Sequence, residues 1–219
     1  IKNGASSSLY LQVTGTPQAL FLQTMASGWH PYFTYYFQPG EGYLGGDFFF
    51  PKEKPECIQL LEELENHTRS VVIRHIACSA QVLASGGKVC NCLFHPSVRQ
   101  AVHAKFEKEV KENLKWCADH LADDFASSIK SEYEKIHPQK AEEISSEEIV
   151  KYAKELIQTN DIKVIVMNGK SDVDSTEYET GCNFVIGGNT LGRGVTFPSL
   201  QTIYYTRTSK KPQADTLWQ

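Results

Sequence analysis

The sequence has no apolar run of the length that spans a membrane. Its six cysteines among 219 residues are too sparse and too irregularly spaced for a disulfide scaffold. Reduced thiols are typical of cytosolic proteins, so we expect a cytoplasmic location. Hydrophobic residues make up 41% of the chain, which excludes a disordered protein and is enough for a substantial core.

The ends of the sequence lack the features of a complete chain. It begins at Ile1 rather than at a methionine, and it stops at Gln219, one turn after Asp215, in a run typical of the start of a helix. A length of 219 residues fits one large domain, or one domain and part of another. We therefore expect a piece of a longer protein.

The chain also has fewer basic than acidic residues: 22 Lys and Arg compared with 26 Asp and Glu, which gives a formal net charge of −4. That net charge argues against a nucleic-acid-binding protein, although binding depends on the local field. Residues 180–214 contain no carboxylate and carry four cations: Arg193, Arg207, Lys210 and Lys211. A basic face on an acidic body is therefore compatible with this composition.

Apolar residues at helical spacing predict three helical regions. Residues 56–84 form one or two helices that end at Gly86-Gly87, and residues 98–129 carry a single stripe that predicts one long helix. A capping box of Ser145 and Glu148 predicts the start of a third helix.

One alternating run, one apolar run and three runs with β-branched residues predict five strands. They cover residues 8–13, 89–94, 162–167, 183–186 and 202–206. Strands that alternate with helices favour a mostly parallel sheet with helices on both faces, so the predicted fold class is α/β.

Two groups of residues have both a functional and a structural interpretation. The aromatic run of residues 28–50 could stack bases, but we interpret it as an ordered connector packed on a core. Five residues could bind zinc, although their spacing favours small buried hydrophobic residues instead, and we predict no metal site: His75, Cys78, Cys90, Cys92 and His95.

The motif Thr14-Gly15-Thr16-Pro17 directly follows the first predicted strand. Ligands of a parallel sheet gather at the carboxyl ends of its strands, where small hydroxyl residues can sense a phosphate or a bound water. The structural alternative is a proline-containing turn whose hydroxyls bind local backbone amides.

A second motif, Gly-Gly-Asn-Thr-Leu-Gly-Arg-Gly-Val-Thr at residues 187–196, directly follows the strand predicted at residues 183–186. Glycines let the backbone approach a ligand, successive amides can bind an anion, and Arg193 adds a guanidinium suited to phosphate. The run is not a Walker loop, because it lacks the Gly-Lys-Ser/Thr ending, and a simple connecting loop is the alternative.

Together these motifs resemble those of superfamily-two helicases. Thr14-Gly15-Thr16-Pro17 resembles their third motif, with Gly15 in the place of an alanine, residues 187–196 resemble the fifth, and residues 215–219 resemble the entry into the sixth. More narrowly, the chain is similar to the endonuclease family called Z-one in three blocks: YLQVTGTPQA, PGEGYLGGDFFF and VIGGNTLGRGVTFPSLQTIYYTRTSKKPQADTLWQ.

That resemblance implies two RecA-like lobes with ATP between them and nucleic acid across both. Residues 1–27 would end the first lobe, residues 28–70 would connect the lobes, and residues 71–219 would form a truncated second lobe. The parent protein would use ATP and magnesium to move along DNA, as the motor of a restriction endonuclease whose nuclease module lies elsewhere in the chain or in a partner.

The resemblance also implies roles for individual residues. Thr14 and Thr16 would couple the nucleotide state to DNA contact, and Gln219 would begin the arginine-finger motif. Residues of the glycine-rich loop would contact the nucleotide or the DNA phosphates: Gly188, Thr190, Arg193, Gly194 and Thr196. His95 and Ser97 could contact the DNA backbone, although we favour Ser97 as the cap of the long helix.

The resemblance places the phosphate-binding lysine loop, the magnesium-binding acids and the finger arginines outside this sequence. We therefore predict no catalytic residue in the chain and no ATP hydrolysis by it alone. Two alternatives remain open: a non-catalytic nucleic-acid or protein interaction domain with a degenerate RecA-like fold, and an unrelated α/β enzyme that binds a phosphorylated metabolite at the glycine-rich loop.

Overall fold

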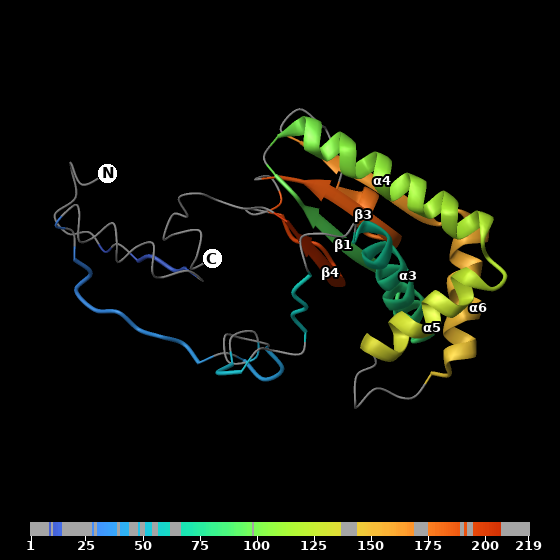
Figure 1. Cartoon of the computed structure of the whole chain (residues 1–219). Helices are drawn as coiled ribbons and strands as arrows, with labels where there is room; N and C mark the ends of the chain where they lie inside the picture. The colour runs from blue at the N-terminus through green and yellow to red at the C-terminus, as the bar shows by residue number, and fades with distance from the viewer. Residues whose placement is uncertain are drawn as a thin grey trace. The chain divides into compact units, whose positions relative to one another are not determined.

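The chain divides into two units, Ile1–Leu60 with Ser209–Gln219, and Leu61–Thr208, and Figure 1 shows the labelled strands and helices of the second unit. A computed structural model describes residues 9, 11–14, 28, 30–38, 40–43, 48, 51–53, 57–61, 67–97, 99–136, 144–168, 175–188, 191 and 195–206. The domain boundaries at residues 27/28 and 70/71 remain predictions.

The second unit is built on a four-stranded parallel sheet. Its strands are β1 (Val89–His95), β2 (Ile162–Met167), β3 (Gly181–Gly187) and β4 (Leu200–Tyr205), in the order β2-β3-β1-β4. The central strand β3 is buried along its whole length, as expected for a parallel sheet that is covered on both faces. The predicted α/β class is confirmed, and the fold is of the Rossmann or RecA-like type.

Four α-helices accompany the sheet: α3 (Thr68–Ala84), α4 (Gln100–Asp119), α5 (Asp124–Ile136) and α6 (Ser146–Thr159). The prediction of one long helix at residues 98–129 was wrong, because the chain turns at residues 120–123. The break lets Phe125 and Ile129 of α5 join Val110 and Cys117 of α4 in one buried cluster. A straight helix would have carried those residues away from the sheet.

The predicted helix ends have the expected chemistry. The Ser145 side chain accepts a hydrogen bond from the Glu148 amide at 3.2 Å and caps α6. Helix α3 ends in a turn in which Gly86 has φ +82°, a conformation that favours glycine, and the amide of Gly87 donates to the Val82 carbonyl at 2.8 Å. The sequence therefore fixed these two boundaries locally.

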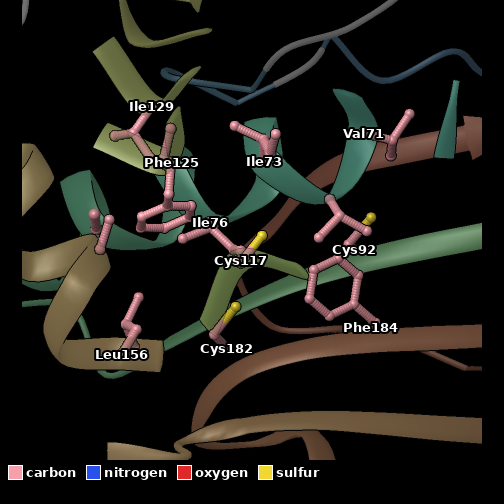
Figure 2. Packing of buried hydrophobic residues seen from close by; sticks show 14 of the residues in the cluster. Val71, Ile73, Ile76, Cys92, Cys117, Phe125, Ile129, Leu156, Cys182 and Phe184 are labelled. Atoms are coloured by element: carbon pink, nitrogen blue, oxygen red, sulfur yellow. The ribbon is translucent and has the colours of Figure 1, made fainter. Parts of the chain in front are cut away.

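One face of the sheet carries all four α-helices. Figure 2 shows apolar side chains of α3, α4, α5 and α6 gathered together with Cys92, Cys182 and Phe184 of the sheet. The opposite face is covered, within the described residues, by the short 3-10 helix η1 (Ser175–Tyr178) and by the connecting residues Leu191 and Phe197. We expected helices on both faces, but in the described residues the only helix on this second face is η1.

The strand order explains this unequal cover. From β1 to β2 the chain crosses the sheet toward the β2 edge, over the face that carries the α-helices. From β2 to β3 and from β3 to β4 it crosses back toward the β4 edge, over the opposite face. The three crossovers therefore share one hand, as the strong preference for right-handed crossovers requires. The two returning paths are short, and their described residues form only η1 and loops.

The described residues of the first unit contradict two further predictions. Residues 11–14 form no strand, and the side chains of Leu9, Leu11 and Val13 are exposed. The described aromatic residues of the connector are likewise exposed rather than packed on a core: Tyr32, Phe33, Tyr35, Tyr36, Phe37, Tyr43 and Phe48. Alternating apolar residues and a high aromatic content indicate that a segment can pack against another element. They do not show that such an element lies next to it in the folded protein.

Candidate nucleotide and nucleic-acid site

The parallel sheet brings the residues that follow its strands to one edge. Because Phe94 pairs with Ile186 in the register, His95 at the end of β1 lies level with Gly187 at the end of the neighbouring β3. The amide of Thr206, after β4, donates to the His95 carbonyl at 3.4 Å, and the rings of His95 and Tyr205 lie 5.2 Å apart. Ligands of open α/β sheets bind at this carboxyl edge.

The glycine-rich loop starts at this edge with a close backbone approach. A Cβ atom on Gly187 would lie 2.7 Å from the Met167 carbonyl oxygen of β2 and 2.9 Å from Leu191 Cγ. The amide of Leu191 donates to the Gly188 carbonyl at 3.0 Å, and Leu191 is buried in the cluster on the non-helical face. Glycine at position 187 is thus required by packing.

The same loop returns toward the start of β4 and is anchored there. Phe197 is buried, and its ring lies 4.8 Å from that of Tyr178 in η1. Thr196, next to it, is exposed. The loop therefore has a buried anchor at each end, Leu191 and Phe197, with the segment that contains Arg193 between them in the sequence.

The structure brings some of the predicted site residues together. Gly188, His95 and Ser97 lie at the carboxyl ends of the adjacent strands β3 and β1, where Gly188 is buried and the other two are half-buried. Thr196 lies on the returning part of the loop, four residues before β4 begins. Thr14 is exposed and belongs to the other compact unit. Five predicted residues lie outside the described ones: Thr16, Thr190, Arg193, Gly194 and Gln219.

Ser97 does not cap the helix in the way we predicted. The N-cap residue of α4 is Arg99, which has no side-chain capping bond, and the Ser97 hydroxyl instead accepts a hydrogen bond from the Arg99 amide at 3.2 Å. The His103 ring lies 2.6 Å from the Ser97 carbonyl oxygen through its Nε2 atom. Ser97 thus shapes the turn before the helix, and the helix begins two residues later than the cap pattern indicated.

The histidine and the cysteines considered for zinc pack as part of the protein interior. The His75 ring lies 4.8 Å from the Phe184 ring in an edge-to-face contact, and burial lowers the pKa of His75 to about 3. Burial also raises the pKa of the Cys90 thiol to about 12, so the neutral thiol is favoured. Within the described ranges, no group of three or more His, Cys, Asp and Glu side chains could hold a metal ion.

Two buried asparagines are the residues that sequence reasoning missed. Asn91 of β1 and Asn183 of β3 are register partners with no exposed surface, and the Asn183 side chain donates to Asn91 Oδ1 at 3.1 Å. The available signal was a Cys-Asn pair repeated inside two apolar strands, at residues 90–91 and 182–183. A polar residue that repeats within buried strands indicates a hydrogen-bonded pair.

Together these features define a class: a parallel α/β domain of the Rossmann or RecA-like type with a glycine-rich loop at the carboxyl edge of its sheet. The family model of the Z1 domain matches residues 59–219, which include β1 to β4 and α3 to α6. The chain belongs to the Z1 domain family, and the resemblance to that family is confirmed. No curated protein and no solved structure matches the chain. No helix in the described part of the chain is long and apolar enough to cross a membrane.

Proposed function

We propose that this chain is part of a nucleic-acid-dependent ATPase, in which the Leu61–Thr208 unit acts as the second RecA-like lobe of a DNA translocase. The supporting observation is the position of the glycine-rich loop, which leaves β3 at the carboxyl edge beside His95 and Ser97 of the adjacent β1. Backbone amides and glycines at such an edge can approach a phosphate closely. The parent protein would bind ATP and magnesium and would belong to a restriction endonuclease, with a nuclease module in the same chain or in a partner.

In this proposal different residues of the loop contribute different groups to phosphate binding. Gly188 and Gly194 allow close backbone approach, Arg193 supplies the cation, and Thr190 and the exposed Thr196 supply hydroxyls. Magnesium and finger arginines stabilise the charge of a transferred phosphoryl group, and the sequence contains no complete Walker loop, because its one Gly-Lys-Ser run, at residues 169–171, has Val164 in the place of the motif's first glycine. The 219-residue chain alone is therefore expected not to hydrolyse ATP, whereas the parent protein does.

The test is an Arg193→Ala substitution in the parent protein. DNA-stimulated ATP hydrolysis should be lost, while the far-ultraviolet circular dichroism spectrum stays unchanged. Lys108→Ala is the control, because Lys108 is an exposed cation on α4 whose side chain is 77% accessible, and it should retain full activity. Unchanged hydrolysis in Arg193→Ala would remove Arg193 from this role.

The salt dependence of DNA binding, measured together with ATP hydrolysis and the binding of small phosphorylated metabolites, separates the motor from its alternatives. Contacts to phosphates release counterions, so the affinity for duplex DNA should fall steeply as salt is raised. Salt-dependent binding by a parent protein that never hydrolyses ATP would favour the non-catalytic interaction domain. Thermal protection by a small phosphorylated metabolite, with no response to DNA, would favour the metabolite enzyme.

A further inference from the structure

Asn91 lies in an environment that normally excludes polar side chains. It is the third residue of β1, one of the two inner strands, it has no exposed surface, and its neighbours Cys90 and Cys92 are equally buried. A buried carboxamide is costly unless its donors and acceptors are paired. The bonds that Asn91 makes therefore indicate what it holds in place.

The carboxamide of Asn91 joins both connections on the non-helical face. Its Nδ2 donates to the Tyr178 carbonyl at 3.0 Å, at the end of the β2–β3 connection, and to the Pro198 carbonyl, at the end of the glycine-rich loop. Its Oδ1 accepts from Asn183. One side chain thus connects η1, β3 and the returning end of the loop.

The returning end of the loop is also a strained turn. Ser199 follows Pro198 and has φ +47°, in the left-handed region that a serine rarely adopts. The backbone amide of Asn91 donates to the Ser199 carbonyl at 2.9 Å, so Asn91 binds both residues of this turn. A strained conformation persists where the surrounding structure holds it, and such places concentrate at functional sites.

We infer that Asn91 is a positioning residue that holds the Pro198–Ser199 turn and thereby sets the placement of the glycine-rich loop for phosphate binding. The functional half of this inference, that Asn91 supports phosphate binding by the loop, rests on the proposed function. The structural half, that Asn91 holds the Pro198–Ser199 turn, does not depend on the proposed function. Asn91 touches no ligand in this role and acts through the loop that it anchors.

Hydrogen–deuterium exchange of the whole chain tests the structural half. Asn91→Ala removes the side-chain bonds to Tyr178 and Pro198 but leaves the backbone bond to Ser199, so the sheet can keep its register. The amides of residues 195–197, 199 and 200 should then exchange at least about tenfold faster, because local opening of the turn is no longer opposed by these bonds.

Asn183→Ala is the matched control, because it removes an equally buried asparagine of the same pair that makes no bond to Pro198. It should leave exchange in residues 195–200 within about threefold of the wild type. Equal acceleration in both variants, or no acceleration in Asn91→Ala, would overturn the anchoring role.

A double-mutant cycle on DNA affinity tests the functional half. Arg193→Ala and Asn91→Ala should each weaken binding of duplex DNA by the chain and lower the salt slope by about one phosphate contact. The double variant should bind no more weakly than Arg193→Ala alone, because both changes remove the same contact. Full additivity would show that Asn91 does not act through the loop.

The possible failures are distinguishable. If neither the wild type nor Arg193→Ala shows phosphate-dependent DNA binding, the proposed function fails, and the exchange data still decide whether Asn91 holds the turn. If Arg193→Ala weakens binding but a folded Asn91→Ala does not, the positioning role fails and the proposed function stands. A general loss of stability would speed exchange in Asn183→Ala as well, so the control separates that case.

Discussion

Replacing Gly187 with alanine tests the close backbone approach that starts the glycine-rich loop. The new Cβ would lie 2.7 Å from the Met167 carbonyl oxygen, 2.9 Å from Leu191 Cγ and 3.1 Å from Leu191 Cδ1. Met167 and Gly187 are register partners in β2 and β3, so the carbonyl can move only if the strands separate. Leu191 must therefore leave its buried position, or the edge of the sheet must open.

The expected loss of stability follows from two opposing contributions. Overpacking of a tightly packed site costs roughly 2 kcal/mol. Alanine also restricts the unfolded chain more than glycine does, which returns about 0.7 kcal/mol. The free energy of unfolding should therefore fall by about 1.3 kcal/mol, and the urea midpoint by roughly 0.6 M at a slope of about 2 kcal/mol per M.

Urea unfolding followed by circular dichroism at 222 nm measures this change, because the signal reports α3 to α6. Gly40→Ala is the control, since a Cβ there meets no atom within 4 Å, and its midpoint should not fall below that of the wild type. If the two variants shift the midpoint equally, or if Gly187→Ala shifts it by less than about 0.2 M, the packing argument for Gly187 is refuted.

Two further predictions concern α6 and the buried histidine. Ser145→Ala removes the hydrogen bond to the Glu148 amide and should cost about 1 kcal/mol of unfolding free energy, whereas Ser146→Ala, which removes no capping bond, should cost less than half of that. Burial lowers the pKa of His75 from 6.5 to about 3, so the unfolded state binds the extra proton between those values and stability falls as the pH is lowered below 6.5. At pH 5 the loss should be roughly 2 kcal/mol, and His75→Leu should remove this part of the pH dependence in urea titrations; an unchanged slope would contradict the burial of a neutral ring.

Local chemistry explains where the sequence-based predictions succeeded. The bounds of β2, Ile162–Met167, agree with the predicted strand, and the cap at Ser145 and the stop at Gly86-Gly87 use groups within four residues of the helix ends. The position of the glycine-rich loop after a strand was also readable, because the strand and the loop are contiguous.

Predictions failed where a segment needed a distant partner. The stripe of residues 98–129 could not reveal the turn at residues 120–123, since both halves keep helical spacing and only packing against α3 and α6 decides where the chain bends. The alternation of residues 8–13 likewise predicted a strand with one apolar face, but no described part of the chain covers Leu9 of that segment, which is 90% exposed.

The sequence by itself determined the class of the fold, the ends of β1 to β4 to within two residues, the end of α3, the start of α6 and the position of the glycine-rich loop, whereas the helix predicted from residue 56 begins only at Thr68. Only the tertiary structure decided the strand order, the single helical face and the pairing of Asn91 with Asn183, which lie 92 residues apart. The physical reason is the distance along the sequence over which each interaction acts. Capping, periodicity and glycine conformations depend on residues a few positions apart, whereas the pairing of a buried strand depends on packing and hydrogen bonding across the whole sheet.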